Sequence, residues 1–453
     1  MSDISFLSAL VTLQLLAPAA SLLAIGLPAL AGHAPSERVT SRVVIAGFVM
    51  AFAGACATLS LLWVRGIGSH EANLGTLFTI GQHTTTFDLV ADWLSVPFAC
   101  FSSGLLCVVA LFARTYMHRE SGFVRFFVLM ATFGTGMNLL VLAGSIDVMF
   151  AGWELVGVSS TLLIGFFHER KNAVDAAMRT FVTYRICDVG FLVAVVVIHG
   201  AVGSGDIARV VDGTWPVGTC LLDRGTALAV SLLLAFAALG KGGQLPFSGW
   251  LPRAMEGPTP SSAIFYGALS IHAAAYLMLR YDAVLDAAPA AGWALAAIGT
   301  ATALHATLVG RTQTDLKSAL AYASMAQSGL ILAEIGLGLR IIPLVHVVSH
   351  ATLRSLQILR APSALRDRHE LSSALGGHHG HGDAEWPRWL PQGLRRKLYR
   401  TALDRGWSER LLLDMGADPA LRVLRALAAT ERRWMRFVSG GASGQSGGGR
   451  SDG

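Results

Sequence analysis

Charged residues are scarce in this sequence of 453 residues: they make up 14% of it, whereas soluble domains carry about a quarter. Hydrophobic residues make up 53%. This balance excludes an ordinary soluble protein. Cysteine is also scarce, and its five residues form no C-x-x-C pair and lie mostly in apolar runs. The cysteine spacing therefore points away from a disulfide framework or a zinc site in this chain.

Long apolar runs occupy most of the sequence up to residue 360. Each covers about 18–25 residues, which is enough to cross the ~30 Å hydrocarbon core of a bilayer. We therefore predict an all-α polytopic membrane protein with about eleven transmembrane helices, one of them broken, and a cytoplasmic amphipathic-helical tail. The opening run lacks a basic n-region, which predicts a retained helix rather than a signal peptide. The predicted spans lie near 5–30, 42–65, 89–113, 124–143, 146–167, 178–199, 226–253 (broken), 262–280, 291–310, 316–338 and 341–359.

Basic residues gather in alternate loops, and the intervening loops are more polar and poorer in them. Residues 66–88, for example, contain no lysine or arginine. By the positive-inside rule, the N-terminus is predicted to lie outside and the C-terminal tail in the cytoplasm. The basic residues that set this orientation are Arg38, Arg42, Arg114, Arg119, Arg125, Arg170, Lys171, Arg179, Arg253 and Arg311.

Lysine is scarce among the basic residues, with four against 31 arginines. One of them, Lys241, ends the apolar run ALAVSLLLAFAALG and is followed by Gly242, Gly243 and Pro246. A charge at membrane depth is costly, and proline removes a backbone hydrogen bond. Lysine can release its proton when buried, whereas arginine does not. The pattern therefore predicts a broken helix whose lysine titrates.

Other ionisable residues lie inside predicted spans. Glu154 lies in MFAGWELVGVSSTLLIGFF and is the expected carboxylate partner of the buried lysine. Arg185 and Asp188 are three residues apart on one helical face, which fits either a structural ion pair or part of the same site. Further candidates lie in later spans, and together they predict a buried polar axis for proton transfer through water: Tyr266, His272, Lys317, His346, His350 and Arg354.

The sequence after residue 360 has a different character. From 360 to 453 it holds 16 lysines and arginines against 10 aspartates and glutamates. Helical spacing of its apolar residues predicts one or two amphipathic helices on the membrane or on a protein partner, with no nucleic acid implied. The loop HHGHGD (378–383) is typical of a linker or an adventitious metal binder. The predicted division is 1–120 N-terminal spans, 121–360 translocation core, 361–440 basic tail and 441–453 disordered Gly/Ser-rich end.

Several motifs together resemble the antiporter-like subunits of complex I, specifically the NuoL type. They are GWELVGVSSTLLIGF, RTFVTYRICDVGFL, GKGGQLPFSGWLPRAMEGPTPSSA, TDLKSALAYASMAQSGLI and HVVSHATLRSL, and they cover roughly 120–360. The resemblance implies that Lys241 is the central proton carrier, that Glu154 pairs with it, and that Asp188 modulates the pair. It also assigns Lys317, His346 and His350 to the proton path.

Two positions depart from the family pattern. Tyr266 stands where the family usually has a histidine, with His272 six residues further on, and Arg354 stands where the family has a lysine. The second broken helix, the later spans and the lateral helix of the family have no counterpart after about residue 360. This arrangement resembles the short DabB-type branch, found in inorganic-carbon accumulation complexes of the bacterial inner membrane.

The resemblance implies a membrane subunit, not itself an enzyme, that couples H+ flow (or Na+ flow) to a cytoplasmic DabA-type partner. That partner resembles a carbonic anhydrase, holds the zinc, and converts CO2 to bicarbonate; no cofactor is expected in this chain. Two other hypotheses remain open. One is a cation/proton antiporter or a respiratory, NADH-dehydrogenase-like complex subunit. The other is a scaffold with an inactive channel that anchors a cytoplasmic enzyme.

Overall fold

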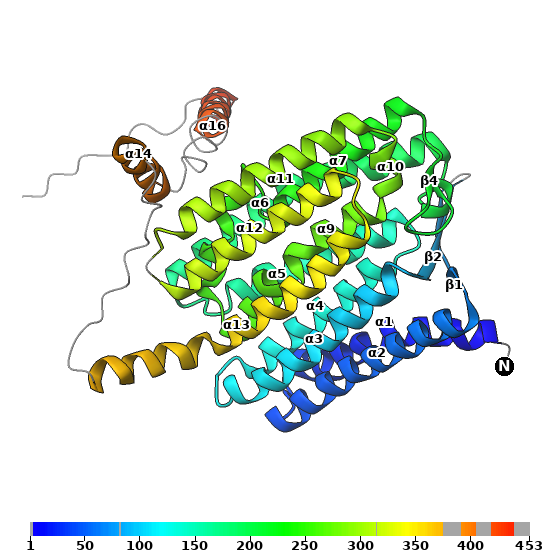
Figure 1. Cartoon of the computed structure of the whole chain (residues 1–453), viewed down its shortest axis with the longest axis horizontal. Coiled ribbons are helices and arrows are strands. Elements are labelled where there is room, and N and C mark those ends of the chain that lie inside the picture. Colours follow the sequence, from blue (N-terminus) through cyan, green and yellow to red (C-terminus); the bar gives the residue numbers. More distant parts are fainter. Residues whose placement is uncertain (1–2, 81–82, 314, 375–390, 405–417, 439–453) are drawn as a thin grey trace, which may run out of the picture.

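The computed structural model describes residues 3–80, 83–313, 315–374, 391–404 and 418–438. A bundle of long helices dominates it (Figure 1), and a helix lies at each of the eleven positions predicted as spans. Within the described ranges, nine helical segments are long and apolar enough to cross a membrane, so the all-α polytopic membrane fold is confirmed. The bundle helices are α1 (Asp3–Leu30), α2 (Glu37–Arg65), α3 (Ser95–Tyr116), α4 (Phe123–Leu142), α5 (Ile146–Ile164), α6 (Lys171–Val202), α7 (Arg224–Lys241), α8 (Thr259–Ser262), α9 (Ser270–Arg280), α11 (Pro289–Gly310), α12 (Leu316–Gly336) and α13 (Ile341–Ala374).

A β-hairpin between α2 and α3 is the main element that the sequence did not predict. Strands β1 (Ser69–Ile80) and β2 (His83–Asp92) pair antiparallel. The predicted third span, starting at 89, is therefore wrong at its beginning, because β2 continues to Asp92 and α3 starts at Ser95. Threonine-rich β2 suits a strand. Asp92 then ends it, because one carboxylate oxygen accepts the backbone N–H groups of Leu94 and Ser95 at 3.1 and 2.7 Å.

Three other boundaries differ from the prediction. Helix α6 begins at Lys171 rather than at 178, and α13 crosses the predicted core–tail boundary at 360 and continues to Ala374. Helix α7 stops at Lys241, and short 3-10 turns, η2 (Phe247–Trp250) and η3 (Arg253–Glu256), replace the second half of the predicted broken helix. In the predicted tail, α14 (Gln392–Leu403) and α16 (Asp418–Val438) are described, whereas 378–383 and 441–453 lie outside the described residues.

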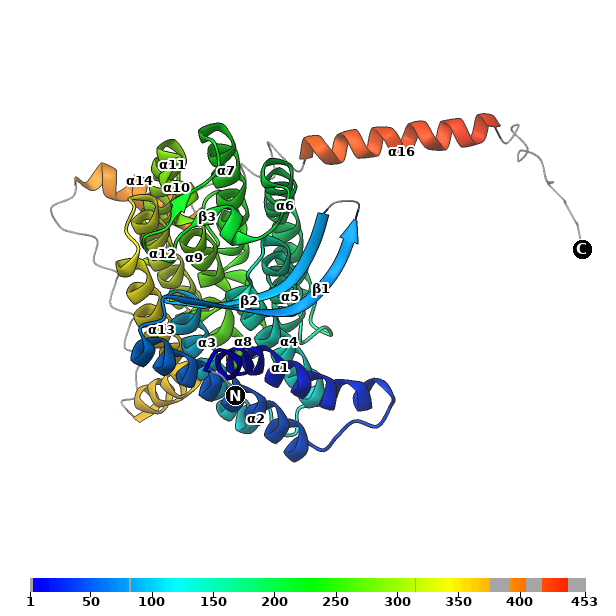
Figure 2. The same ribbon diagram turned by 90° about the vertical axis from the view of Figure 1, so that its right-hand side faces the viewer.

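The two ends of the bundle differ in structure and charge. One end, here the hairpin side, carries β1 and β2, the short pair β3 (Val211–Asp212) and β4 (Thr219–Cys220), and α10 (Asp282–Asp286). Figure 2 looks onto this end, with the hairpin lying across it. The opposite end, here the basic side, carries the connections 31–36, 117–122 and 165–170 and the residues 311–313 that follow α11. Most of the basic residues used for the orientation prediction lie in these connections or in the adjoining helix turns, and Arg253, in η3, lines a cavity together with Lys317.

Glycine brings several helices into backbone contact. A Cβ on Gly152 of α5 would lie 2.7 Å from the Cα of Leu140 and 2.8 Å from the carbonyl oxygen of Gly136, both on α4. The same kind of contact joins α11 to α12, where a Cβ on Gly299 would lie 2.5 Å from the carbonyl oxygen of Gly329. Small residues allow this close approach inside a membrane, where no hydrophobic force drives helices together.

Replacing Gly152 by alanine is expected to destabilise the protein, because backbone atoms of α4 cannot move aside as a side chain could. Overpacking of this kind costs about 1–3 kcal/mol or more. Gly200, near the end of α6, is the control, since a Cβ there would meet no atom within 4 Å. Thermal unfolding in mild detergent should show a lower midpoint for Gly152→Ala and an unchanged or higher midpoint for Gly200→Ala.

Candidate functional site

The last residue of α7, Lys241, lies in the interior of the bundle. Its side chain is fully buried, and its Nζ donates a hydrogen bond to the backbone carbonyl oxygen of Trp153 at 2.9 Å. The helix cannot carry the chain further here, because Gly242 caps it and Gly243 adopts a φ of 63°, in the left-handed region that favours glycine. The sequence therefore places the lysine at a helix end, inside the protein.

Aromatic rings surround the ammonium group of Lys241. Its Nζ lies 4.4 Å from the ring centroid of Trp153 and 4.8 Å from that of Tyr184, which is the geometry of cation–π contacts. A Cβ on Gly157 would lie 3.0 Å from the same Nζ, so glycine at this position leaves room for the amine. These contacts stabilise the charged form, and no carboxylate among the described residues forms a direct ion pair with it.

The carboxylates near the lysine are held by other groups. The indole nitrogen of Trp153 donates to Asp188 at 2.5 Å, and Arg185 contacts the other oxygen of Asp188 at 2.9 Å. Arg185 also forms an ion pair with Glu154. The expected direct pair of Glu154 with Lys241 is therefore replaced, in this conformation, by a Glu154–Arg185–Asp188 cluster. Because Arg185 competes for both carboxylates, the lysine interacts with them through space and through Trp153.

The chain after Lys241 is stabilised by side chains from α11 and α12. Because the helix has ended, the carbonyl oxygen of Gly242 needs new donors, and it accepts from Gln244 at 2.9 Å and from Ser328 at 3.3 Å. The backbone N–H of Leu245 donates to Thr302 at 3.0 Å, just before Pro246. The interruption is thus a hydrogen-bonded structure rather than a gap in the bundle.

A second group of polar side chains joins α9 to α13. His350 and His272 are both buried, and the Nδ1 of His350 lies 3.2 Å from the Nε2 of His272. The Nδ1 of His272 contacts the carbonyl oxygen of Ala268. A donor at Nδ1 of His272 satisfies that carbonyl, and its Nε2 then accepts from His350. This tautomer pair carries no net charge, which suits a buried position.

His346 lies one turn from His350 on α13, with the two ring centroids 6.4 Å apart. Its Nδ1 lies 2.9 Å from a carboxylate oxygen of Glu334, and its Nε2 lies 2.9 Å from the side-chain oxygen of Gln327. Both ring nitrogens of His346 therefore have polar partners on α12. Three histidines therefore form a continuous group that ends on a carboxylate.

The remaining predicted residues lie apart from these two groups. Lys317, at the start of α12, lines a cavity of about 600 Å³ on the basic side, together with Asp175 and Glu256. Arg354, half-buried on α13, donates to Gln357 at 2.8 Å. The side chain of Tyr266 lies outside the described part of the structure. In the described part of the chain, no three His, Cys, Asp or Glu residues gather as a metal site requires.

Comparison with known families identifies the bundle. The family described as "NADH:quinone oxidoreductase/Mrp antiporter, TM" matches residues 143–375, just over half of the chain. The chain belongs to this family of antiporter-like membrane subunits. A second match, "NADH-Ubiquinone oxidoreductase (complex I), chain 5 N-terminus", covers 77–127. The first match includes α5, α6, α7, α9, α12 and α13, which carry both polar groups.

Relatives of this antiporter-like subunit include subunits of quinone oxidoreductases. The chain is 32% identical over 335 residues to NAD(P)H-quinone oxidoreductase chain 5 of Picosynechococcus sp., covering 73% of the chain and 50% of that protein. It is 31% identical over 326 residues to NADH-quinone oxidoreductase subunit L of Escherichia coli, covering 71% and 52%. The chain thus spans about half the length of these curated relatives. The Mrp complex of Dietzia sp. shares the fold, with a TM-score of 0.65, 24% identity, and coverage of 93% of this chain and 46% of that one.

Several residues that build the site of this antiporter-like subunit were missed from the sequence. Trp153 precedes Glu154 in the motif GWEL, but an aromatic residue in an apolar span gives no signal that distinguishes packing from hydrogen bonding. Gln327 and Glu334 are polar residues on α12 that we assigned no role. Their spacing of seven residues puts them on one helical face, which could have indicated a shared partner on another helix.

Proposed function

We propose that this antiporter-like subunit conducts protons through the membrane, with Lys241 as the central carrier. The observation that supports this most strongly is the position of Lys241: a fully buried amine, without a direct carboxylate partner, beside a hydrogen-bonded break in the bundle. A lysine that was purely structural would need a close counterion, because an isolated buried charge is costly. A lysine that exchanges its proton spends part of its time neutral.

The proposed path contains two groups of side chains that carry protons. The first is Lys241 with the Glu154–Arg185–Asp188 cluster, in which movement of Arg185 changes the field at the lysine. The second is the histidine group, in which His346, beside Glu334, exchanges protons with His350 and His272. Lys317, at the cavity on the basic side, connects this path to water there. Arg354 keeps its charge and limits access from its end of α13.

We propose further that the basic side faces the cytoplasm of a bacterium and that proton flow drives a cytoplasmic, zinc-containing partner like a carbonic anhydrase. Hydration of CO2 releases a proton, so coupled proton movement would bias that reaction toward bicarbonate. The arginine-rich helices α14 and α16 support a docking role, since exposed apolar residues on α16, such as Trp434 and Met435, are interspersed with arginines.

A second candidate function is favoured by the relatives. The respiratory names of the curated relatives and the Mrp complex among the structural neighbours fit a cation/proton antiporter or a respiratory-complex subunit equally well. Both candidates share the proton path and differ in what the path drives. A third role, that of an inactive anchor, is opposed by the buried Lys241.

Purification of the tagged full chain from its native membrane in mild detergent, followed by mass spectrometry and zinc analysis, separates these candidates. A stoichiometric, zinc-containing, carbonic-anhydrase-like protein is the expected result. Recovery of respiratory subunits, or of the chain alone, would overturn the inorganic-carbon proposal in favour of the second candidate. A chain carrying Lys241→Ala should retain the same partner, because Lys241 lies in the interior, away from any docking surface.

A further inference from the structure

A polar cavity of about 120 Å³ lies on the hairpin side, between β1, β2, the 206–218 segment and the end of α9. It belongs to neither of the two polar groups described above. The ionisable residues that line it come from four parts of the chain: His70, Glu71, Asp92, Asp206, Arg280 and Asp282. Its size leaves room for several water molecules.

Two buried N–H donors indicate that water fills this cavity. The indole nitrogen of Trp215 and the Nε of Arg280 are buried, and neither meets a hydrogen-bond acceptor among the residues that the structure describes. Both residues line the cavity, and they are 8% and 7% exposed. A buried donor without a partner is costly, and ordered water is its usual acceptor. The cavity thus presents donors, carboxylates and space together.

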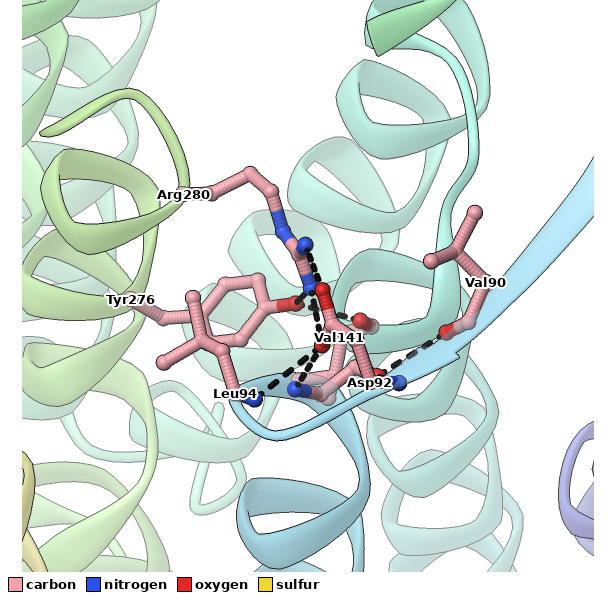
Figure 3. A network of polar contacts seen from close by, with 7 residues as sticks. Val90, Asp92, Leu94, Val141, Tyr276 and Arg280 are labelled. Atoms are coloured by element: carbon pink, nitrogen blue, oxygen red, sulfur yellow. Dashed lines mark hydrogen bonds and ion pairs between the residues drawn. The ribbon is translucent and has the colours of Figure 1, made fainter. Parts of the chain in front are cut away.

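A hydrogen-bonded network around Asp92 and Arg280, two residues that line the cavity, reaches Tyr276 of α9 (Figure 3). Arg280 forms an ion pair with Asp92 at 2.5 Å and donates to the hydroxyl of Tyr276 at 2.8 Å, and that hydroxyl donates to the carbonyl oxygen of Val141 at 2.5 Å. His272, Tyr276 and Arg280 follow one face of α9 at four-residue spacing, so Tyr276 lies between His272 and the cavity. Neither the arginine nor the carbonyl can pass on a proton, so in this conformation the network closes the path between His272 and the cavity.

We propose that this cavity is a water-filled vestibule in which protons exchange with the solvent on the hairpin side, with Asp282 and Glu71 as the exchanging carboxylates. The inference rests on the proposed proton conduction and names the place where the path meets water. Asp282 suits the role because its side chain is 9% exposed and its carboxylate lies 3.1 Å from Arg340, outside the Asp92–Arg280 pair. Both carboxylates line the vestibule itself.

The charges around Asp282 support exchange near neutral pH. Burial raises the pKa of Asp282 to about 6, against the opposing effect of Arg340. Burial also raises the pKa of Glu71, and the negative charges of Asp88 and Asp206 add to that rise. The other charged groups around Asp282 are Arg280 and Asp286. Asp282 is therefore mostly ionised at pH 7 and accepts protons, and it becomes protonated as the pH on the hairpin side falls through about 6.

Labelling with a water-soluble carbodiimide tests the vestibule without any measurement of transport. Carbodiimides modify protonated carboxyl groups, so mass spectrometry of the purified full chain should find Asp282 modified about tenfold more at pH 5 than at pH 7, as expected for a carboxyl group with a pKa of about 6. The modification should be lost in the variant Asp282→Asn, which is the control for the assigned position. Absence of modification at Asp282 at either pH would overturn the vestibule.

Proton flux into liposomes, followed with a pH-sensitive dye, tests the role of the vestibule in proton conduction. Asp282→Asn and Glu71→Gln together are expected to reduce flux by about 10²-fold, the scale for loss of a positioned proton carrier, whereas Asp286→Asn should leave it unchanged. If Lys241→Ala abolishes flux but the double variant conducts normally, the vestibule proposal is wrong and the proposed function stands. If Lys241→Ala itself conducts normally, the proposed function is wrong, and carbodiimide labelling of Asp282 still reports on the cavity.

Discussion

Lys241→Ala is expected to abolish proton conduction and to leave the chain folded in the membrane. The substitution removes the only amine in the Trp153–Tyr184 aromatic enclosure that the structure describes. It also removes a buried charge, which is itself costly, and this offsets part of the cost of the cavity that the shorter side chain leaves. The carbonyl oxygen of Trp153 remains within helix α5 and keeps its helical acceptor role. A loss of about 10²-fold or more in flux is the expected scale for a proton carrier.

The measurement is dye-monitored proton flux in liposomes, with size-exclusion chromatography to show that the variant is assembled. Lys171→Ala is the matched control, because that lysine is exposed at the start of α6. Lys241→Arg adds a sharper test. Arginine keeps the charge but does not release its proton, so this variant should also fail to conduct. Normal flux through Lys241→Arg would show that only a fixed positive charge is needed at this position.

Asp92→Asn is expected to have the largest effect on stability. Asp92 and Arg280 form a buried ion pair, with side chains 4% and 6% exposed, and removal of one partner leaves a buried charge. The usual cost is about 3–5 kcal/mol. Asparagine retains a side-chain oxygen that can still accept from the backbone N–H groups of Leu94 and Ser95, so the helix cap is kept. Any loss of stability is then due to the lost charge of Asp92. Thermal unfolding in detergent measures the effect.

The double variant Asp92→Asn/Arg280→Met is the control, because it removes both charges and should recover much of the lost stability. The pH dependence provides a second check. Burial alone would raise the pKa of Asp92, but Arg280 and the hydrogen bonds of Ser95 outweigh it and hold this pKa below its ordinary value. The stabilisation by the pair is thus present above the ordinary aspartate pKa and is lost as the pH falls through the lowered one. An unfolding midpoint of Asp92→Asn equal to that of the wild type would contradict the prediction.

The sequence predicted the helices well because apolar length alone specifies a membrane span. It also selected Lys241, Asp188, His346 and His350, since an ionisable residue inside a span is costly and usually belongs to a functional site. Their partners could not be predicted, because they come from different helices. Glu154 lies within reach of both a lysine and an arginine, and only the packing of α5 against α6 brings Arg185 to it.

The hairpin and the Asp92–Arg280 pair were missed for a related reason. Strand β2 merges with the following apolar run without a turn signal, so its last residues, 89–92, were assigned to a helix. Arg280 ends a predicted span and looked like an ordinary residue at the membrane surface. Its partner lies 188 positions away in the sequence, and no local pattern connects residues at such separation.

Helix α12 contacts both polar groups, and its contact with α11 determines how it can move. Where Gly299 and Gly329 meet, the two backbones touch without interlocking side chains, and Gly336 meets Gly292 in the same way. Such smooth surfaces favour sliding along the helix axis over tilting. Ser328 of α12 holds the carbonyl of Gly242, and Glu334 of α12 holds His346. A slide of α12 would therefore change the surroundings of Lys241 and of the histidines at the same time.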